Sequence, residues 1–464
     1  MLSLQQEKNR QVAQALNLTV GDVRKQLVRI ALPIMGTSFI HMAYSFTDMA
    51  WLGRLGSEAV AAVGVVSVLI WLAYSISYIN KTGSEVTVGQ SLGQEQQDRA
   101  AHYASHNITI SILISLVLGL IYFLFGRNIF AFYKLSPEVE ELSFSYLKIV
   151  LLGFPCTFFS ITVSGIYNGS GLSHIPFKVA ASGLILNMIL DPLLIFVLGW
   201  GTEGAAWATT ISQFVVFWLS YYYIRHKAQL FGGFPLLVHL RWIYVREILR
   251  IGLPVAILNS LFVFVSIFLG RQASSAAIHS GLPGHIGVAT LTTGGQLEGL
   301  TWNTSQGFAT ALSSIVAQNY AAGKPDRIFL AYKYTLMYTS IFGGLGTLLF
   351  VFWGSQFYSL IVPEPMAYQA GGVYLRIIGF SQLLMMCEIA TQGLFYGCGR
   401  SMPPAIISIV GNYLRIPVAI YCINRGMGLE AIWWIISISS MFKGSVALFW
   451  MFILRKKLLH RVSL

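Results

Sequence analysis

Twelve long apolar stretches recur along this chain of 464 residues, and they restrict its fold more than any other feature of the sequence. A helix needs about 20 apolar residues to cross the hydrocarbon core of a bilayer. Backbone in that core must satisfy its own hydrogen bonds, so the stretches predict helices, and the short alternating segments typical of a membrane barrel do not occur in the sequence. The stretches cover residues 27–53, 59–82, 105–126, 143–167, 175–199, 204–224, 248–270, 286–313, 331–353, 368–395, 403–423 and 430–454. The sequence therefore predicts an all-α integral membrane protein with twelve transmembrane helices.

The charged residues support a membrane location and orient the chain. Only 10% of the residues are charged and 55% are hydrophobic, whereas a soluble domain carries about a quarter charged residues. When both termini are placed in the cytoplasm, 21 of the 30 Lys and Arg residues fall on the inner side, five on the outer side and four within helices. This positive-inside bias predicts a multi-pass protein of the cytoplasmic (inner) membrane with both termini cytoplasmic. It also accounts for the net charge of +12, so no nucleic-acid partner is expected.

The second half of the chain repeats the first at an offset of 228 residues. The matching residues include Tyr146-Leu147 with Tyr374-Leu375, Asp98-Arg99 with Asp326-Arg327, and Gly165, Gly169, Gly171, Ser173 and Pro176 with Gly393, Gly397, Gly399, Ser401 and Pro404. Six helices form each half, so both halves begin on the same side of the membrane and the repeats are parallel. Such duplication, with a binding site between or within the repeats, is typical of transporters and disfavours a receptor or a channel.

The repeat also predicts the domain organisation. A cytoplasmic N-terminal segment covers residues 1–26, and a first lobe of helices 1–6 covers 27–224. A cytoplasmic linker, 225–247, leads to a second lobe of helices 7–12 at 248–454, followed by a cytoplasmic tail at 455–464.

Acidic residues inside the predicted helices are the candidate functional residues. Of the 18 acids, only Asp48, Asp191, Glu298 and Glu388 lie well within helices, where an ionised carboxylate is costly and usually functional. Counting 1.5 Å per residue from the outer helix ends places Asp48 and Thr209 at a depth of roughly 9 Å and Asp191 at roughly 12 Å. These three residues are therefore expected at one level of the first lobe.

Two further residues share helix faces with these acids. Asn187 precedes Asp191 by four residues, and Tyr44 precedes Asp48 by four. Carboxylate, amide and hydroxyl oxygens suit a hard cation such as Na⁺, and two neighbouring carboxylates could equally hold a proton. The alternative is a purely structural hydrogen-bond network between the helices.

Other polar and helix-bending residues complete the candidates. Pro33 lies below Asp48 and permits a bend in helix 1, or else only shapes the entry of the helix. Glu298 and Glu388 could attract cationic substrates, with Trp302 adding a cation–π contact. Arg415, deep in helix 11, needs a partner, for which Glu388 is a candidate.

Motifs for enzymes and cofactors are absent from the sequence. There is no Walker A motif, no Gly-x-Ser-x-Gly or His-Glu-x-x-His motif, and the four cysteines lack metal-ligand spacing. No cofactor other than a coupling ion is expected, and an integral-membrane enzyme is the weaker alternative.

The order of several short motifs resembles the MATE (multidrug and toxic compound extrusion) family over essentially the whole chain. The motifs are Leu32-Pro33, Phe46-Thr47-Asp48-x-x-x-Leu52-Gly53, Val88-Gly89-Gln90-x-x-Gly93, Gly165-x-x-x-Gly169-x-Gly171, Asn187-x-x-x-Asp191-Pro192, Gly204-Ala205-Ala206-x-Ala208-Thr209, Val316-Ala317-Gln318-Asn319 and Gly393-x-x-x-Gly397-x-Gly399. The spacing is most similar to that of archaeal and DinF-like members. The resemblance implies two six-helix bundles related as parallel repeats.

The resemblance also implies roles for individual residues. Asp48, Asn187, Asp191 and Thr209 would form the cation site of the first lobe, with Tyr44 beside it and Pro33 as the helix-1 bend. Glu298 falls where many members carry an acid in helix 8. The segment 253–259 lacks the helix-7 acid of other branches, and Glu388 does not align with their helix-10 acid.

The function expected on these grounds is antiport. The chain would export small cationic, amphipathic drugs or toxins by alternating access, in exchange for H⁺ or Na⁺, as a monomer whose other partners are membrane lipids. A flippase for a lipid-linked precursor is the alternative within transport. It would call for a strongly basic cavity, whereas the helix-embedded charges are four acids and four bases.

Overall fold

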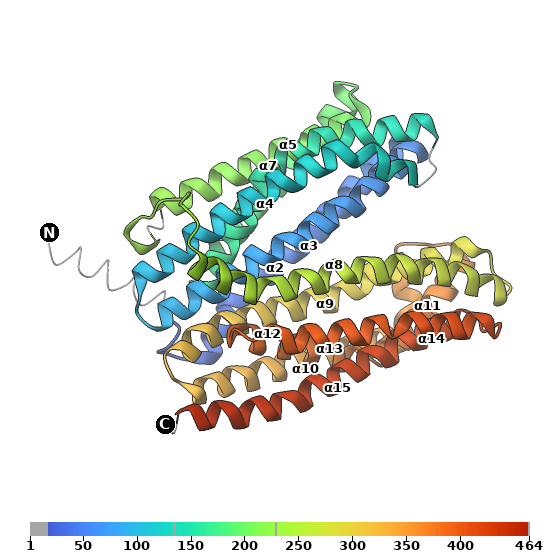
Figure 1. Ribbon diagram of the computed structural model, residues 1–464. Coiled ribbons are helices and arrows are strands. Elements are labelled where there is room, and N and C mark those ends of the chain that lie inside the picture. The colour runs from blue at the N-terminus through green and yellow to red at the C-terminus, as the bar shows by residue number, and fades with distance from the viewer. Residues whose placement is uncertain (1–16, 133–135, 228–229, 463–464) are drawn as a thin grey trace. The chain divides into compact units, whose positions relative to one another are not determined.

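Helices joined by short connections form the whole of the described chain (Figure 1). The structure, a computed structural model, describes residues 17–132, 136–227 and 230–462. Most of the predicted N-terminal segment (1–26), residues 228–229 of the predicted linker and residues 463–464 of the predicted tail lie outside the described residues. No β-strand occurs within the described ranges. The prediction of an all-α fold is confirmed.

The helices follow the twelve predicted apolar stretches. They are α2 (Val23–Leu55), α3 (Ser57–Gly93), α4 (Gln97–Phe132), α5 (Pro137–Gly169), α6 (His174–Pro192), α7 (Gly201–Tyr222), α8 (Trp242–His279), α9 (Gly284–Ala321), α10 (Pro325–Ser359), α11 (Pro365–Gly379), α12 (Gln382–Gly397), α13 (Met402–Tyr413), α14 (Arg415–Asn424) and α15 (Leu429–Val462). A π turn, η1 (Leu193–Val197), extends α6, and two short turns, η2 (Tyr223–Lys227) and η3 (Leu230–Gly232), follow α7.

Nine of these helices are long and apolar enough to cross a membrane, counting only the described residues. They become ten if α11 and α12, which meet at an angle of 56°, form one bent span. The other two predicted spans correspond to α7 and α9, which are 22 and 38 residues long and richer in polar side chains. The protein is therefore a multi-pass membrane protein.

The repeated glycines allow equivalent helices to approach closely in each half. A Cβ atom on Gly165 or Gly169 of α5 would collide with backbone of α3 at Lys81 or Glu85. In the second half, a Cβ on Gly393 of α12 would collide in the same way with the backbone of α9 at Ala309. The Gly-x-x-x-Gly motif, repeated at an offset of 228, thus forms an equivalent helix contact in each half, as expected for small residues at membrane helix interfaces.

The chain divides into two compact units, and two helices belong partly to each. Unit 1 contains residues 1–18 and 32–256, and unit 2 contains residues 19–31 and 257–464. The predicted lobes differ from these units, because the start of α2 belongs to unit 2 and the start of α8 belongs to unit 1. Both changes of unit occur within three residues of a proline, Pro33 in α2 and Pro254 in α8.

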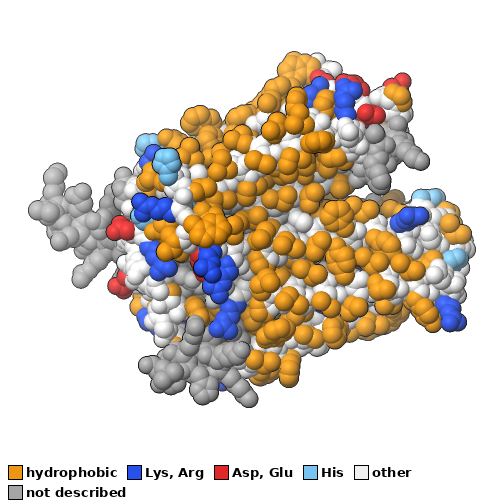
Figure 2. Space-filling model, viewed as in Figure 1, with side chains coloured by type: hydrophobic (Ala, Val, Ile, Leu, Met, Phe, Trp, Pro, Cys, Tyr) orange, Lys and Arg blue, Asp and Glu red, His pale blue; other side chains and the backbone are white. Residues whose placement is uncertain are grey.

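Apolar side chains cover the middles of the helices on the face shown in Figure 2, and charged side chains gather near the helix ends. Many large apolar residues are exposed along α4, α10 and α15, among them Leu120, Leu345 and Phe449. In water such a surface would be unstable, whereas lipid tails are as apolar as these side chains. The distribution agrees with a membrane-embedded chain.

Candidate functional site

The predicted acids of the first half come together within unit 1. Asp48 lies on α2, whereas Asn187 and Asp191 lie on one face of α6 and are almost fully buried. The Asn187 amide donates a hydrogen bond of 3.3 Å to Oδ1 of Asp191. The carboxylates of Asp48 and Asp191 are near enough to interact electrostatically. The structure thus brings Asp48, Asn187 and Asp191 together.

Three buried oxygens of this cluster are left without donors. Oδ1 of Asp48, Oδ1 of Asn187 and Oδ2 of Asp191 accept no hydrogen bond from any residue that the structure describes. Buried polar atoms are nearly always partnered, and an unpartnered acceptor costs about 1–3 kcal/mol. A small cation or a proton would satisfy such a set of acceptors, and the oxygen chemistry fits Na⁺.

Hydroxyl groups lie near the acids. The hydroxyls of Tyr44 on α2 and Thr209 on α7 lie 2.7 Å apart and share a hydrogen bond. Tyr146 on α5 lies near Thr209 and interacts electrostatically with Asp48 and Asp191. We define these six residues as the unit 1 cluster: Tyr44, Asp48, Tyr146, Asn187, Asp191 and Thr209.

Irregular backbone follows the acid of α6. The helix ends at Pro192, directly after Asp191, and continues as the π turn η1. Proline removes a backbone donor, and π turns are frequent at functional sites. Pro33, by contrast, lies inside α2, which stays helical from Val23 to Leu55, and its carbonyl accepts a hydrogen bond of 3.0 Å from the hydroxyl of Thr37. The predicted bend at Pro33 stays a prediction.

Glu298, in unit 2, has partners on both carboxylate oxygens. Tyr374 of α11 donates a hydrogen bond of 3.2 Å to Oε2, and the amide of Gln382 of α12 donates one of 3.2 Å to Oε1. Gln382 is held in turn by the hydroxyl of Thr301, at 2.6 Å from its amide oxygen. Glu298 is therefore a satisfied acceptor, unlike the acids of unit 1.

Glu388 forms an ion pair, but with a different base from the one proposed. Its carboxylate lies 3.4 Å from the ammonium of Lys443 on α15, and Ser408 and Gln392 donate to its Oε1 at 2.7 and 3.1 Å. Arg415 instead donates to the hydroxyls of Ser439 and Ser440, each at 3.1 Å. The suggested Arg415–Glu388 pair is therefore wrong, because Lys443 on α15 takes the carboxylate.

Trp302 has fewer contacts with polar or aromatic groups than the other predicted site residues. Its side chain on α9 is 41% exposed and makes no hydrogen bond or ring contact with another described residue. It follows Glu298 by one helical turn, but Glu298 bonds to Tyr374 and Gln382 instead.

Sequence reasoning overlooked Tyr146 and Lys443. Tyr146 carried a usable signal, since Tyr146-Leu147 recurs as Tyr374-Leu375, and each tyrosine contacts the cluster of its own unit. Lys443 is a base inside an apolar helix, which by itself calls for a buried acid as partner.

Comparison with known proteins gives one consistent result. The model of the MatE family matches residues 33–193 and 260–421, one segment in each half of the chain. The probable multidrug resistance protein NorM of Thermotoga maritima is 26% identical over 428 residues, which cover 89% of each chain. The FAD transporter of Shewanella oneidensis is 22% identical over 386 residues, covering 81% of each chain. The solved structure of a MOP superfamily transporter from Pyrococcus furiosus superimposes with a TM-score of 0.89, at 23% identity, over 96% of this chain and 98% of the other.

Proposed function

Because the chain belongs to the MatE family of membrane transporters, we propose that it is a cation-coupled efflux antiporter whose coupling ion, H⁺ or Na⁺, binds in the unit 1 cluster. The exported compounds are small, cationic and amphipathic. The protein acts as a monomer in the cytoplasmic membrane, with both termini in the cytoplasm, and needs no cofactor besides the ion. The predicted roles of Asp48, Asn187, Asp191 and Thr209 belong to this proposal.

One observation carries the proposal: the three unpartnered oxygens of the unit 1 cluster. A structural network, the alternative, would satisfy its own acceptors, as the network around Glu298 does. Two neighbouring carboxylates with no base beside them are also costly unless a positive charge joins them. A mobile cation supplies that charge and leaves again, which is what coupling requires.

Alternating access follows from linking ion binding to the shape of α2. This helix carries Tyr44 and Asp48 of the cluster, and its first turns belong to unit 2. A cation drawn toward Asp48 and Asp191 shifts the equilibrium toward the conformation in which the oxygens converge, by as much as its affinity differs between the two states. Pro33 lies where such a change would be absorbed in α2.

Transport by purified protein in proteoliposomes tests the proposal. Efflux of a fluorescent cationic dye is measured under a Na⁺ gradient and, separately, under a pH gradient. We expect one gradient to drive efflux and Asp48→Asn and Asp191→Asn to abolish the response. Glu298→Gln is the matched control, since Glu298 is an embedded acid with satisfied oxygens. Full gradient-driven efflux in Asp48→Asn would contradict the proposal.

Two further test compounds, flavin dinucleotide and a lipid-linked phosphate, distinguish drug antiport from the alternative substrates. The Shewanella oneidensis relative is named for FAD, an anionic dinucleotide, so flavin dinucleotide is tested beside the dye. If neither gradient drives movement of either compound in folded protein, the lipid flippase becomes the better hypothesis, and a fluorescent lipid-linked phosphate replaces the dye in the assay.

A further inference from the structure

Two basic residues lie at equivalent positions of the two halves. Each belongs to an apolar helix, and its side chain is exposed on the surface of that helix. Lys148 of α5 follows Tyr146-Leu147, and Arg376 of α11 follows Tyr374-Leu375, at the offset of 228. Each lies eleven residues after the proline that begins its helix, Pro137 or Pro365, or roughly 16 Å along the axis. Counted from the starts of the predicted apolar stretches at 143 and 368, Lys148 is five residues deep and Arg376 eight, or roughly 8 and 12 Å.

Neither base has an acidic partner. Of the acids in the described residues, none lies within ion-pair distance of Lys148 or Arg376. The other two helix-embedded bases, Lys443 and Arg415, are buried and bonded to polar side chains. An exposed charge at this depth is costly unless it reaches headgroups or meets an anion. Because an exposed base without an acidic partner occurs at this position in both halves, we expect one explanation for both.

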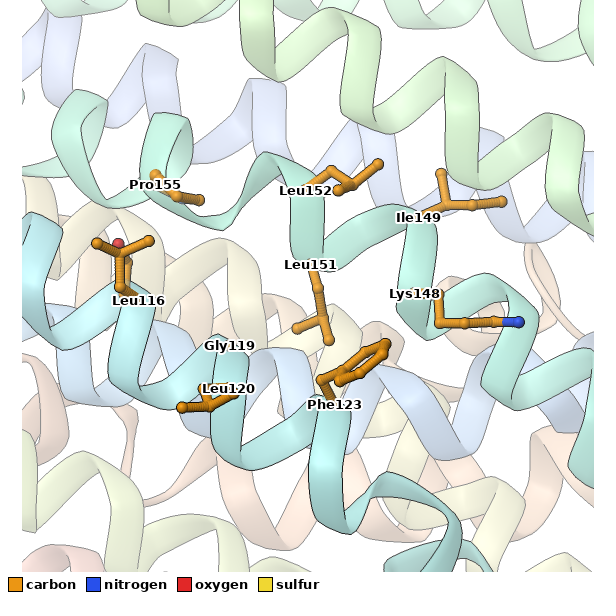
Figure 3. A pocket seen from close by; sticks show the side chains of 10 residues that line it. Leu116, Gly119, Leu120, Phe123, Lys148, Ile149, Leu151, Leu152 and Pro155 are labelled. Atoms are coloured by element: carbon orange, nitrogen blue, oxygen red, sulfur yellow. The ribbon is translucent and has the colours of Figure 1, made fainter.

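A groove adjoins Lys148 on the surface of unit 1 (Figure 3). It is an open groove of about 520 Å³ between α4 and α5. Its other lining residues are almost all apolar or small: Ser115, Leu116, Gly119, Leu120, Phe123, Ile149, Leu151, Leu152 and Pro155. In the close-up the amine of Lys148 lies at the end of the groove opposite Leu116 and Pro155. The groove thus combines an apolar channel with a cation at one end.

The charged end of the groove has an excess of positive charge. The ammonium of Lys148 lies 5.0 Å from the centre of the Phe144 ring, and the guanidinium of Arg127 lies 4.7 Å from the same ring. Glu141 neutralises Arg127 at 2.9 Å, which leaves the charge of Lys148 uncompensated. An anionic group at this end of the groove would neutralise the charge of Lys148.

We propose that the groove between α4 and α5 binds an anionic phospholipid of the surrounding membrane, with one acyl chain in the apolar channel and the headgroup phosphate on Lys148, and that Arg376 holds a second headgroup at the equivalent position of α11. The lipid is the occupant because the groove opens on an apolar surface, where Leu120 and Leu152 are both more than half exposed. A soluble anion has no access to a site surrounded by lipid tails, whereas a lipid phosphate is tethered there. The proposal does not depend on the transported substrate.

Lipid retention by purified protein tests this inference. The protein is exchanged into mixed micelles of detergent with equal amounts of phosphatidylglycerol and phosphatidylcholine, and bound lipids are counted by native mass spectrometry. We expect the wild-type protein to retain phosphatidylglycerol selectively. Lys148→Gln and Arg376→Gln should each lose about one such lipid, with an affinity about fivefold lower for each base removed. Lys148→Arg keeps the charge and should retain the lipid.

Two further variants control for folding and for general loss of positive charge. Arg54→Gln removes an exposed base at the end of α2, outside the groove, and should leave the lipid count unchanged. Gly119→Leu leaves Lys148 in place and fills the groove, since a Cβ on Gly119 meets no atom within 4 Å. It should displace the lipid although the protein folds normally. Equal retention of the two lipids by the wild type, or an unchanged lipid count in both Lys148→Gln and Gly119→Leu, would overturn the proposal.

Discussion

The offset of 228 pairs Asn187 of unit 1 with Arg415 of unit 2, Thr209 with Ser437, and Tyr146 with Tyr374. In unit 1 the amide of Asn187 lies beside two acids and keeps an unpartnered oxygen. In unit 2 the same position carries a guanidinium, bonded to two serine hydroxyls and attracted by Glu298 and Glu388. One half thus presents acceptors open to a mobile cation, and the other contains a cation fixed to the chain.

The two halves are therefore expected to differ in ion binding despite their common origin. A tethered guanidinium satisfies nearby acceptors permanently and repels a second cation. Unit 2 also contains the Glu388–Lys443 pair, so its buried acids are matched by buried bases. Coupling is therefore expected in unit 1 alone, and unit 2 is expected to have a structural role.

Placing an arginine in unit 1 at the position equivalent to Arg415 is expected to have the largest effect on ion coupling. Asn187→Arg gives unit 1 the residue found in unit 2, and the guanidinium should occupy the acceptors of Asp48 and Asp191. Gradient-driven efflux should fall by roughly a hundredfold, since charge-assisted hydrogen bonds to both carboxylates compete with the ion. Efflux assays in proteoliposomes measure this, with Asn187→Gln as control. If Asn187→Arg is coupled as tightly as wild type, the proposed division between the units is wrong.

Breaking the buried pair of unit 2 should mainly affect stability. Lys443→Met leaves Glu388 buried without its base and should cost about 3–5 kcal/mol. The double variant Glu388→Gln/Lys443→Met removes both charges and should recover most of that loss. Thermal unfolding in detergent compares the three proteins. A loss of ion coupling in the double variant at normal stability would mean that unit 2 takes part in coupling.

Removing the hydroxyl of Thr209 should weaken the cluster without removing charge. Thr209→Val loses the 2.7 Å hydrogen bond with Tyr44 and one oxygen donor, which is worth about 1 kcal/mol, or about a fivefold weaker apparent affinity for the driving ion. Thr209→Ser restores the hydroxyl and should behave like the wild type. The dependence of efflux on ion concentration measures the change, and an unaltered dependence in Thr209→Val would limit the site to the acids and Asn187.

The paired tyrosines should show the smallest effect on ion coupling, and they separate coupling from stability. Tyr146→Phe should change the ion dependence of efflux by about twofold to threefold, because its hydroxyl interacts electrostatically with Asp48 and Asp191. Tyr374→Phe should leave that dependence unchanged and lower stability by about 1.5 kcal/mol, since it removes a donor from Glu298. The opposite pattern would place the ion in unit 2.

The helices and the unit 1 cluster were largely predictable from sequence, for identifiable reasons. Apolar runs of membrane length leave no alternative to helices. Acids inside such runs are expected to face a polar interior, and this criterion selected Asp48, Asp191, Glu298 and Glu388. Counting residues from the helix ends then gave Asp48 and Asp191 a similar depth. The partners of Arg415 and Glu388 were not predictable in this way, because depth alone does not say which way a side chain turns.

The sequence by itself determined the helical fold type, its duplication and the acids that lie within apolar helices, because hydrophobic length and internal repetition are local properties of the chain. Only the tertiary structure decided which acceptors were satisfied. Glu298 and Asp48 look alike in sequence, as acids within apolar helices, yet Tyr374 and Gln382 reach the first and no described donor reaches Oδ1 of the second. Hydrogen bonding depends on ångström-scale distances between different helices, and such distances exist only once the helices have packed.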